Sequence, residues 1–360
     1  MELQKYIQNK DYFQEFKNHK LNVRKYSKMG LMIVKAYRNN NYDYEKYPWM
    51  RYCRGCVINT NTNRVVCVPP MKSEEKEDIS DIISNYDESL KYYPLIDGTM
   101  INMFFHNDEW IISTRSNIGG KNSWDGKVPF NKLFKEVNGV DWFSSLDKGC
   151  CYSFVLQHLN NRIITPVMGN KIIMVEKYKL GENIEKCDDF ETIENIETIK
   201  SFDSEVLKTY NSDIPYCIKG FTIKSNDMRY KWINPAYSYV EGLKMNNNNK
   251  FLSYMELRSK WILNDYLTYF PEERTLFDNY KERITYVKNE LFNSYIKFRV
   301  KKEIDIMSIE YSLRPHINKL HEYYKKNNVT ITRKIASNYV NKLDGRQLIF
   351  IINRICDSKV

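Results

Sequence analysis

Long apolar runs are missing from this sequence, and their absence limits the class of protein. The longest, such as Leu348–Ile352, are far shorter than the roughly 20 apolar residues that a membrane-spanning helix needs. The N-terminal stretch MELQKYIQNKDYF has no apolar signal region and is too acidic for a transit peptide. We therefore expect a soluble, cytoplasmic protein with no membrane partner.

A disulfide framework is also missing, although the chain has eight cysteines. Their scattered positions fit free thiols in a reducing compartment. Cys53 and Cys56 have the spacing of a metal or redox site, but a second pair with this spacing is absent. We therefore favour small buried residues on a strand over a zinc or redox site, and expect neither a metal nor a cofactor.

The sequence does contain an excess of positive charge and many aromatic rings. It has 55 Lys and Arg against 45 Asp and Glu, a formal net charge of +10, and 28 tyrosines. Basic side chains neutralise phosphates and aromatic rings stack on bases, so this composition fits a polyanionic partner such as RNA or DNA. A soluble basic surface without such a partner is the alternative.

The hydrophobic pattern divides the chain into three parts. Residues 1–49 are predicted to form an N-terminal helical or irregular segment. Residues 50–245 contain successive pairs of apolar strands, which predict an antiparallel α+β domain. The predicted hairpins turn at His106–Glu109, Asn160–Asn161 and Ser225–Asp227.

Residues 250–360 are predicted to form a basic, all-α domain. Pro271 suits the first turn of a long helix. Further helices are expected near 314–326 and 333–355, and the basic run Lys297–Lys302 suits a helix end or a phosphate backbone. Residues 251–360 carry 20 Lys and Arg against 13 Asp and Glu, so much of the positive charge lies here. One buried face of the long helix is predicted to contain Leu276, Tyr280, Ile284, Val287, Leu291, Tyr295 and Phe298.

Five motifs in order give the middle domain a resemblance to a known family. They are CRG followed by a lysine, IDG, TRSNIGG, FVLQHLNNRI and KGFTIK. Over roughly residues 50–240 they resemble the nucleotidyltransferase domain of phage-type ATP-dependent RNA ligases and, more distantly, of mRNA-capping guanylyltransferases. The chain resembles a catalytically degenerate form of this fold, like proteins of large DNA viruses, for which a host cytoplasm or viral factory is the expected location.

The same resemblance identifies what this chain lacks. In such ligases a lysine two residues before the aspartate attacks the α-phosphate of a nucleoside triphosphate, and the matching residue here is Leu95. Val155 and Lys219 stand where the family has glutamates, and Ile233 replaces the second lysine of its last pair. The resemblance therefore implies that no catalytic residue and no metal site remain.

The cations that contact phosphates in the family are largely kept. The resemblance assigns nucleotide or phosphate binding to Arg54, Lys72, Asp97, Gly98, Arg115, Lys224 and Lys231. Three strand aromatics are candidates for base stacking, with a core position as the alternative: Trp110, Phe154 and Trp232. His158 has no visible nucleophile beside it and is interpreted as structural.

We therefore predict a catalytically inactive, RNA-binding relative of these enzymes. A phosphate pocket without a nucleophile should hold an RNA 5′ end, or by family analogy a cap, and leave it unchanged. The helical domain is expected to contact RNA or a viral or host protein. Two alternatives stay open: an active ATP-dependent RNA ligase with a relocated lysine, and a protein-interaction scaffold in viral transcription or translation.

Overall fold

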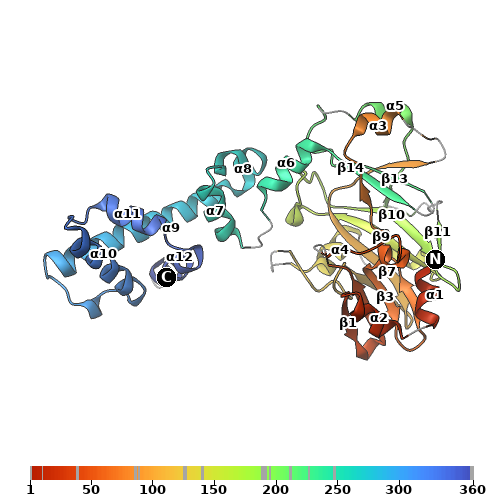
Figure 1. Cartoon of the computed structure of the whole chain (residues 1–360), viewed down its shortest axis with the longest axis horizontal. Helices are drawn as coiled ribbons and strands as arrows, with labels where there is room; N and C mark the ends of the chain where they lie inside the picture. The colour runs from red at the N-terminus through yellow and green to blue at the C-terminus, as the bar shows by residue number, and fades with distance from the viewer. Residues whose placement is uncertain are drawn as a thin grey trace. The chain divides into compact units, whose positions relative to one another are not determined.

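The chain folds into two units, Met1–Glu241 and Gly242–Val360 (Figure 1). This division lies within a few residues of the predicted boundary between the middle and helical domains. The predicted linker residues Asn246–Asn248 and the turn residues Asn226 and Asp227 lie outside the described part of the chain. The computed structural model describes residues 2–9, 11–37, 40–84, 87, 90–124, 128–138, 142–187, 193, 196–210, 213–225, 228–245 and 249–356.

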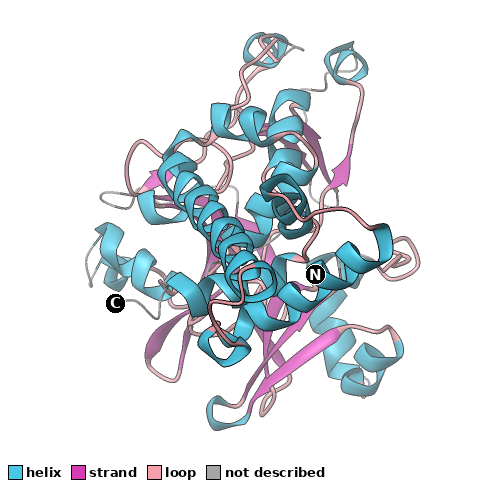
Figure 2. Ribbon diagram, turned by 90° about the vertical axis from the view of Figure 1, so that its left-hand side faces the viewer, coloured by secondary structure: helices cyan, strands magenta, loops and turns pink. Residues whose placement is uncertain are grey.

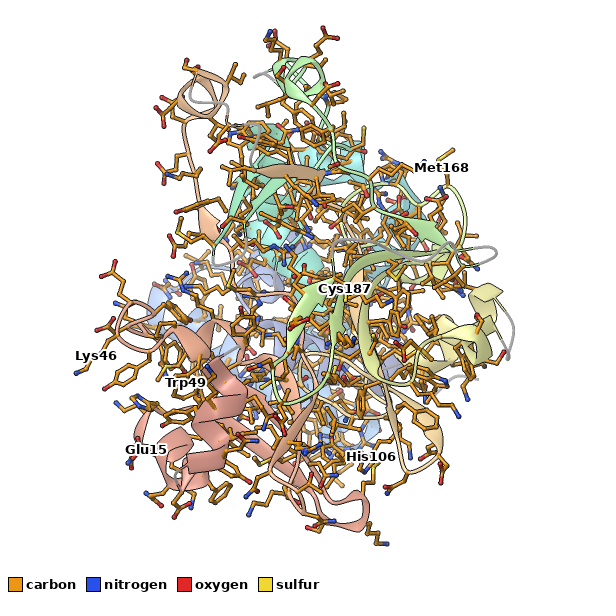
Figure 3. The ribbon with its side chains drawn as sticks, turned by 90° about the vertical axis from the view of Figure 1, so that its right-hand side faces the viewer. Glu15, Lys46, Trp49, His106, Met168 and Cys187 are labelled. Atoms are coloured by element: carbon orange, nitrogen blue, oxygen red, sulfur yellow. The ribbon has the colours of Figure 1, made fainter. Side chains whose placement is uncertain are left out.

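The first sheet of the N-terminal unit has four antiparallel strands in the order β1-β2-β3-β4. Trp49 stacks on Tyr6 of the first helix with ring centroids 4.3 Å apart, and lies beside the two N-terminal helices (Figure 3). These elements are α1 Glu2–Asn9, α2 Tyr12–Asn18, β1 Asn22–Tyr26, β2 Leu31–Lys35, β3 Arg54–Asn59 and β4 Arg64–Cys67.

The prediction of a separate helical or irregular segment over residues 1–49 is wrong, because two of its stretches are strands. β2 pairs with β3, with Ile33 opposite Val57. Four of the five β2 residues are buried, so the strand lacks the polar–apolar alternation that identifies a half-buried strand. Cys53 and Cys56 are fully buried, which confirms their interpretation as small core residues.

The second sheet has the order β11-β10-β9-β7-β8, with β12 added beside β10. The predicted hairpin over residues 99–113 is confirmed: Asn107 and Asp108 both have positive φ, as a tight two-residue turn requires. The pairing of β9 with β10 is confirmed as well. The elements are β7 Thr99–His106, β8 Glu109–Ser113, α4 Phe130–Asn138, β9 Cys150–Gln157, β10 Lys171–Lys179, β11 Glu185–Cys187 and β12 Glu197–Thr198.

The third sheet has the order β5-β14-β13-β6 and contains the third predicted hairpin, β13 and β14. The short helices α3 and α5 contact each other beside this sheet (Figure 1). Tyr93 of β6 packs against Val155 and Val175 of the second sheet, so the two sheets share an apolar layer. The elements are β5 Glu74–Glu75, α3 Ile79–Ser84, β6 Lys91–Pro94, α5 Ser204–Lys208, β13 Gly220–Lys224, β14 Arg229–Ile233 and α6 Pro235–Leu243.

The C-terminal unit is helical, as predicted. Figure 2 shows helices in cyan and strands in magenta. The long helix α9 follows a 3₁₀ turn that begins at Pro271, and α7, α10, α11 and α12 contact it (Figure 1). Its buried residues include Ile284, Val287, Leu291 and Tyr295, but Phe277 replaces the predicted Leu276, which is 38% exposed. No helix in the described part of the chain is long and apolar enough to cross a membrane. The helices are α7 Lys250–Ser259, α8 Leu263–Tyr269, α9 Arg274–Tyr295, α10 Arg314–Asn327, α11 Arg333–Asn341 and α12 Gly345–Cys356.

Candidate functional site

The site begins where the chain passes from β6 in the third sheet to β7 in the second. Asp97 lies in this short crossing and is 5% exposed. Its Oδ1 accepts from the Lys219 ammonium at 3.0 Å and from the Tyr237 hydroxyl at 2.6 Å. Its Oδ2 accepts from the backbone N–H groups of Ile164 and Thr165 at 2.9 and 3.0 Å.

This set of donors fixes the ionisation of the carboxyl group. Burial raises the pKa of Asp97. The charge of Lys219 and the hydrogen bonds from Tyr237 and two backbone N–H groups outweigh this effect, so the pKa lies below its ordinary value. Burial and the facing carboxylate raise the pKa of Tyr237, so that hydroxyl keeps its proton. The Thr165 hydroxyl also donates to Oδ2 at 3.4 Å, so two donors on Oδ1 and three on Oδ2 use the acceptor sites of the carboxylate. The Asp97 carboxylate therefore binds groups of the protein itself.

Leu95 lies next to the residue that holds Asp97. Its backbone N–H donates to the Gly220 carbonyl at 2.8 Å, which places Leu95 beside the start of β13 and beside Lys219. Gly98 has a φ of 152°, and a Cβ there would lie 2.6 Å from the Leu156 carbonyl oxygen. Gly98 is therefore needed for close packing on β9.

A group of cations lies near the N-terminal sheet and the end of β14. Burial lowers the pKa of Lys72, and the neighbouring charges of Arg54, Arg51 and Lys231 lower it further. Arg51 and Lys231 form ion pairs with Glu74 and Glu75 respectively. The Lys72 ammonium lies 4.2 Å from the ring centroid of Tyr44. The structure thus brings together three predicted site residues, Arg54, Lys72 and Lys231.

Arg115 has a clear structural contact. Its Nη2 donates to the Ala36 carbonyl at 3.0 Å. Its backbone also packs closely against Gly55, where a Cβ would lie 2.8 Å from the Arg115 Cα. Arg115 therefore ties the loop after β8 to the segment that carries Arg54.

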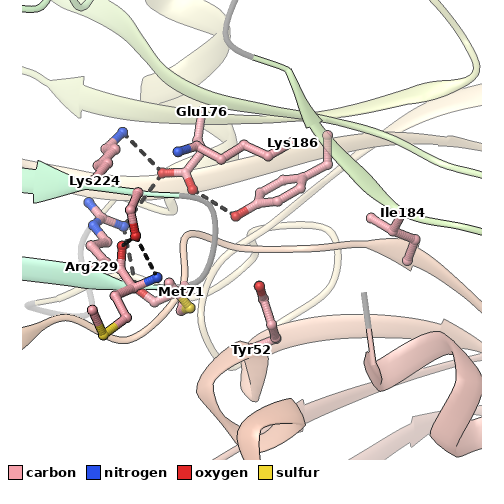
Figure 4. Close-up of a pocket in the computed structure, with 10 residues that line it drawn as sticks. Tyr52, Met71, Glu176, Ile184, Lys186, Lys224 and Arg229 are labelled. Atoms are coloured by element: carbon pink, nitrogen blue, oxygen red, sulfur yellow. Dashed lines mark hydrogen bonds and ion pairs between the residues drawn. The ribbon is translucent and has the colours of Figure 1, made fainter. Parts of the chain in front are cut away.

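A cavity of about 190 Å³ lies beside these cations and between β10, the end of β13 and the start of β14 (Figure 4). Glu176 of β10 is buried in its wall. One carboxylate oxygen lies 3.2 Å from the Lys224 ammonium and 3.5 Å from the Arg229 guanidinium, and the other accepts from Tyr178 at 2.7 Å. Lys186, Tyr52 and Met71 also line the cavity.

The cavity has more positive than negative charge. Burial alone raises the pKa of Glu176, but Lys224, Arg229 and the Tyr178 hydroxyl bring it down to about 2. Burial lowers the pKa of Lys224 to about 8, and Arg229 adds to this effect while Glu176 opposes it. Among the described residues that line the cavity there are three cations, Lys186, Lys224 and Arg229, and one carboxylate, so a small anion is the favoured ligand.

Sequence reasoning missed three charged residues of this cavity: Glu176, Lys186 and Arg229. The sequence signal for Glu176 is an acidic residue that directly follows the apolar run IIMV. Arg229 stands two residues before Lys231, so both side chains belong to the same face of β14. Arg229 is therefore a second cation on this face, and the assignment of Ile233 to the position of the family's second lysine stays a prediction.

The candidate stacking residues are mostly part of the core. Phe154 is fully buried and Trp232 is 2% exposed, so neither ring face is open to a base in this structure. Trp110 is partly buried and packs edge-on against Phe105 with centroids 5.4 Å apart. His158 is 2% exposed and lies 3.3 Å from a Glu136 carboxylate oxygen, in agreement with a structural role.

Comparison with known proteins places these features in context. No protein-family model matches the chain. A protein of Autographa californica nuclear polyhedrosis virus, described as a bifunctional polynucleotide kinase/RNA ligase, is 26% identical over 164 residues, which span 41% of this chain and 23% of that protein. An immediate-early protein ICP-46 homolog of Invertebrate iridescent virus 3 is 19% identical over 306 residues, which span 77% of this chain and 66% of that protein.

Two solved ligase structures also match the chain, both with TM-scores below 0.5. A protein of Aquifex aeolicus described as an ATP-dependent DNA ligase matches with a TM-score of 0.45 and 14% identity, over 76% of this chain and 72% of that one. An archaeal ATP-dependent RNA ligase matches with a TM-score of 0.38 and 10% identity, over 75% and 74%. The sequence match to the nuclear polyhedrosis virus protein confirms the predicted resemblance to viral RNA ligase-like proteins.

Proposed function

We propose that this protein binds the phosphates of an RNA 5′ end and does not transfer a nucleotide. The observation that supports this most is the state of Asp97, whose two oxygens are occupied by Lys219, Tyr237 and two backbone N–H groups. Nucleotidyl transfer needs an amine nucleophile and carboxylates that hold a metal ion. Leu95 supplies no amine, and the carboxylate two residues further on is already neutralised.

The cavity supports the binding half of the proposal. Met71 and Tyr52 line it, and they adjoin Lys72, Arg51 and, two residues on, Arg54 along the chain. Arg229 also donates to the Met71 carbonyl at 3.4 Å, which couples the cavity wall to the Lys72 segment. A phosphate held by Lys186, Lys224 and Arg229 would have further cations next to it for a second and a third phosphate.

One experiment separates 5′-end binding from general binding of RNA. The affinity of the full chain is measured for RNAs of one sequence that carry a 5′-triphosphate, a 5′-monophosphate, a cap or a 5′-hydroxyl, and for the circular form. We expect the triphosphate or capped end to bind at least tenfold more tightly than the circle. Arg54→Ala, Lys72→Ala and Arg229→Ala should remove the difference. Lys135→Ala, at an exposed position on α4, should retain it. Equal affinity for all five RNAs would remove the proposal.

A second candidate function, nucleotidyl transfer with a relocated lysine, is favoured by one observation. The pKa of Lys224 is lowered to about 8, as a nucleophilic amine requires, and this residue lines the cavity. Against it, the ammonium donates to the Val175 carbonyl at 3.1 Å and to Glu176 at 3.2 Å. Incubation with labelled ATP or GTP and Mg²⁺ decides the matter: a covalent adduct that Lys224→Met abolishes supports transfer, and its absence with both nucleotides supports binding alone.

A further inference from the structure

The turn between α7 and α8 carries an exposed tryptophan in an unfavourable backbone conformation. Trp261 is 91% exposed and has a φ of +62°. The backbone N–H of Trp261 donates to the Arg258 carbonyl, and the backbone N–H of Ile262 donates to the Leu257 carbonyl. This is the hydrogen-bond pattern of a helix end that normally has glycine at the position of Trp261. Neither the exposure nor the conformation helps folding, and such a residue points to a function.

A cavity of about 490 Å³ lies beside this ring. Its wall combines apolar side chains with amide and hydroxyl groups from the end of α7, the start of α8 and the end of α11. The Arg258 guanidinium holds one side of this wall, because its Nη2 donates to the Asn341 side-chain oxygen at 2.9 Å. Residues of the wall include Met255, Arg258, Ser259, Leu263, Asn264 and Asn341.

The wall of the cavity carries the positive charge of Arg258, and Lys288 on α9 lies within electrostatic range of that charge. Burial lowers the pKa of Lys288, and the charge of Arg258 lowers it further. Within the described residues, no ion pair joins Arg258 or Lys288 to an acid. The nearby Glu256 instead pairs with Lys260 at 2.7 Å. Two like charges held near each other favour an anion between them.

We infer that Trp261 and the Arg258–Lys288 pair form a binding site for one nucleotide of single-stranded RNA, separate from the 5′-end cavity. A base would stack on the exposed indole, and its phosphate would take the two cations. Asn264 and Ser259 offer hydrogen bonds to the base edge. An aromatic ring beside cations is the usual arrangement for single strands. An apolar protein surface fits less well, since it would bury two unbalanced charges.

The test uses a substitution that should improve the helix end while removing the ring. Trp261→Gly places the preferred residue at this left-handed position, so we expect an unchanged or higher Tm. Affinity for a short single-stranded RNA with a 5′-hydroxyl should fall by about tenfold, the range of one lost base stack. This RNA carries no 5′-phosphate, so the result is independent of the 5′-end proposal.

Two further variants keep the test sharp. Trp261→Phe should retain most of the affinity, because it keeps a stacking face. Arg258→Gln combined with Lys288→Gln should weaken binding and reduce the slope of log affinity against log salt by about 1. Parent-like RNA affinity of Trp261→Gly would overturn the inference. The inference would also be wrong if Trp261→Gly left RNA affinity unchanged and only reduced the capture of a protein from a nuclease-treated extract.

Discussion

The ammonium of Lys219 lies 3.0 Å from Oδ1 of Asp97. Asp97 follows strand β6 of the third sheet, and Lys219 directly precedes strand β13 of the same sheet. By its resemblance to ATP-dependent ligases, this chain has a lysine where those enzymes have an acid, and a leucine where they have the nucleophilic lysine. Lys219 adjoins Gly220, whose carbonyl accepts from the Leu95 N–H, and the Lys219 ammonium neutralises the Asp97 carboxylate.

We expect removal of that ammonium to be costly. Lys219→Met leaves Asp97 buried with one donor fewer, and should lower the free energy of unfolding by about 1–3 kcal/mol. The matched control is Lys171→Met, which breaks the exposed ion pair with Glu197 and should cost about 0–1 kcal/mol. Urea unfolding measures both. Equal losses for the two variants would contradict a special role for the Asp97 pair.

Glu176 should make the free energy of unfolding decrease at acidic pH. Its folded pKa is about 2 against an ordinary 4.5, so its contribution is complete above pH 4.5 and is lost as the pH falls towards 2. We expect Glu176→Gln to cost about 3 kcal/mol at neutral pH, and the difference from the parent to shrink over that window. Unfolding curves at several pH values give the result. A difference that stays constant down to pH 2.5 counts against the buried ion-pair cluster, and the exposed Glu197→Gln serves as control.

Lys224 should make the affinity for anions fall as the pH rises. Its pKa in the folded protein is about 8, so its positive charge is present below this value and is lost as the pH rises through it. Affinity for inorganic triphosphate should therefore fall between pH 7 and 9. Lys224→Arg keeps its charge throughout this range and should flatten the profile. A parent profile that is already flat would show that Lys224 does not contact the anion.

Two glycines provide a test of the crossing segment. Gly98→Ala places a Cβ 2.6 Å from the Leu156 carbonyl oxygen at a φ of 152°, and should destabilise the protein by about 1–3 kcal/mol. Gly242→Ala lies at the end of α6, where a Cβ meets nothing within 4 Å, and should instead stabilise by about 0.5–1 kcal/mol. Thermal unfolding compares the two. The same sign for both variants would contradict the packing argument.

The sequence predicted the elements that depend on local signals. Turn residues such as Asn107 and Asp108 identified the hairpins, and Pro271 marked the start of the long helix. Strand β2 was missed because burial on both faces removes its alternation, and the periodic pattern on α9 placed Leu276 where Phe277 is buried. A helical pattern fixes a face only to within a neighbouring residue.

The binding site was predicted less completely, because its contacts join distant parts of the chain. Motif order brought out Asp97, Lys72 and Lys231, which local sequence marks as polar residues among strands. The ion pairs of Glu176 link β10 to β13 and β14, some 50 residues further on, and no short-range pattern reports them. The same holds for Trp261, whose importance rests on its backbone conformation and exposure.

The hydrogen bonds of Asp97 also bear on the order in which the protein is made. The carboxylate lies in the first third of the chain, whereas one of its donors, Tyr237, follows 140 residues later. During synthesis the N-terminal sheet emerges first, but Asp97 cannot be fully neutralised until Lys219 and Tyr237 have left the ribosome. We therefore expect the crossing between the two sheets to close late, because a nascent chain that stops before α6 lacks the Tyr237 donor.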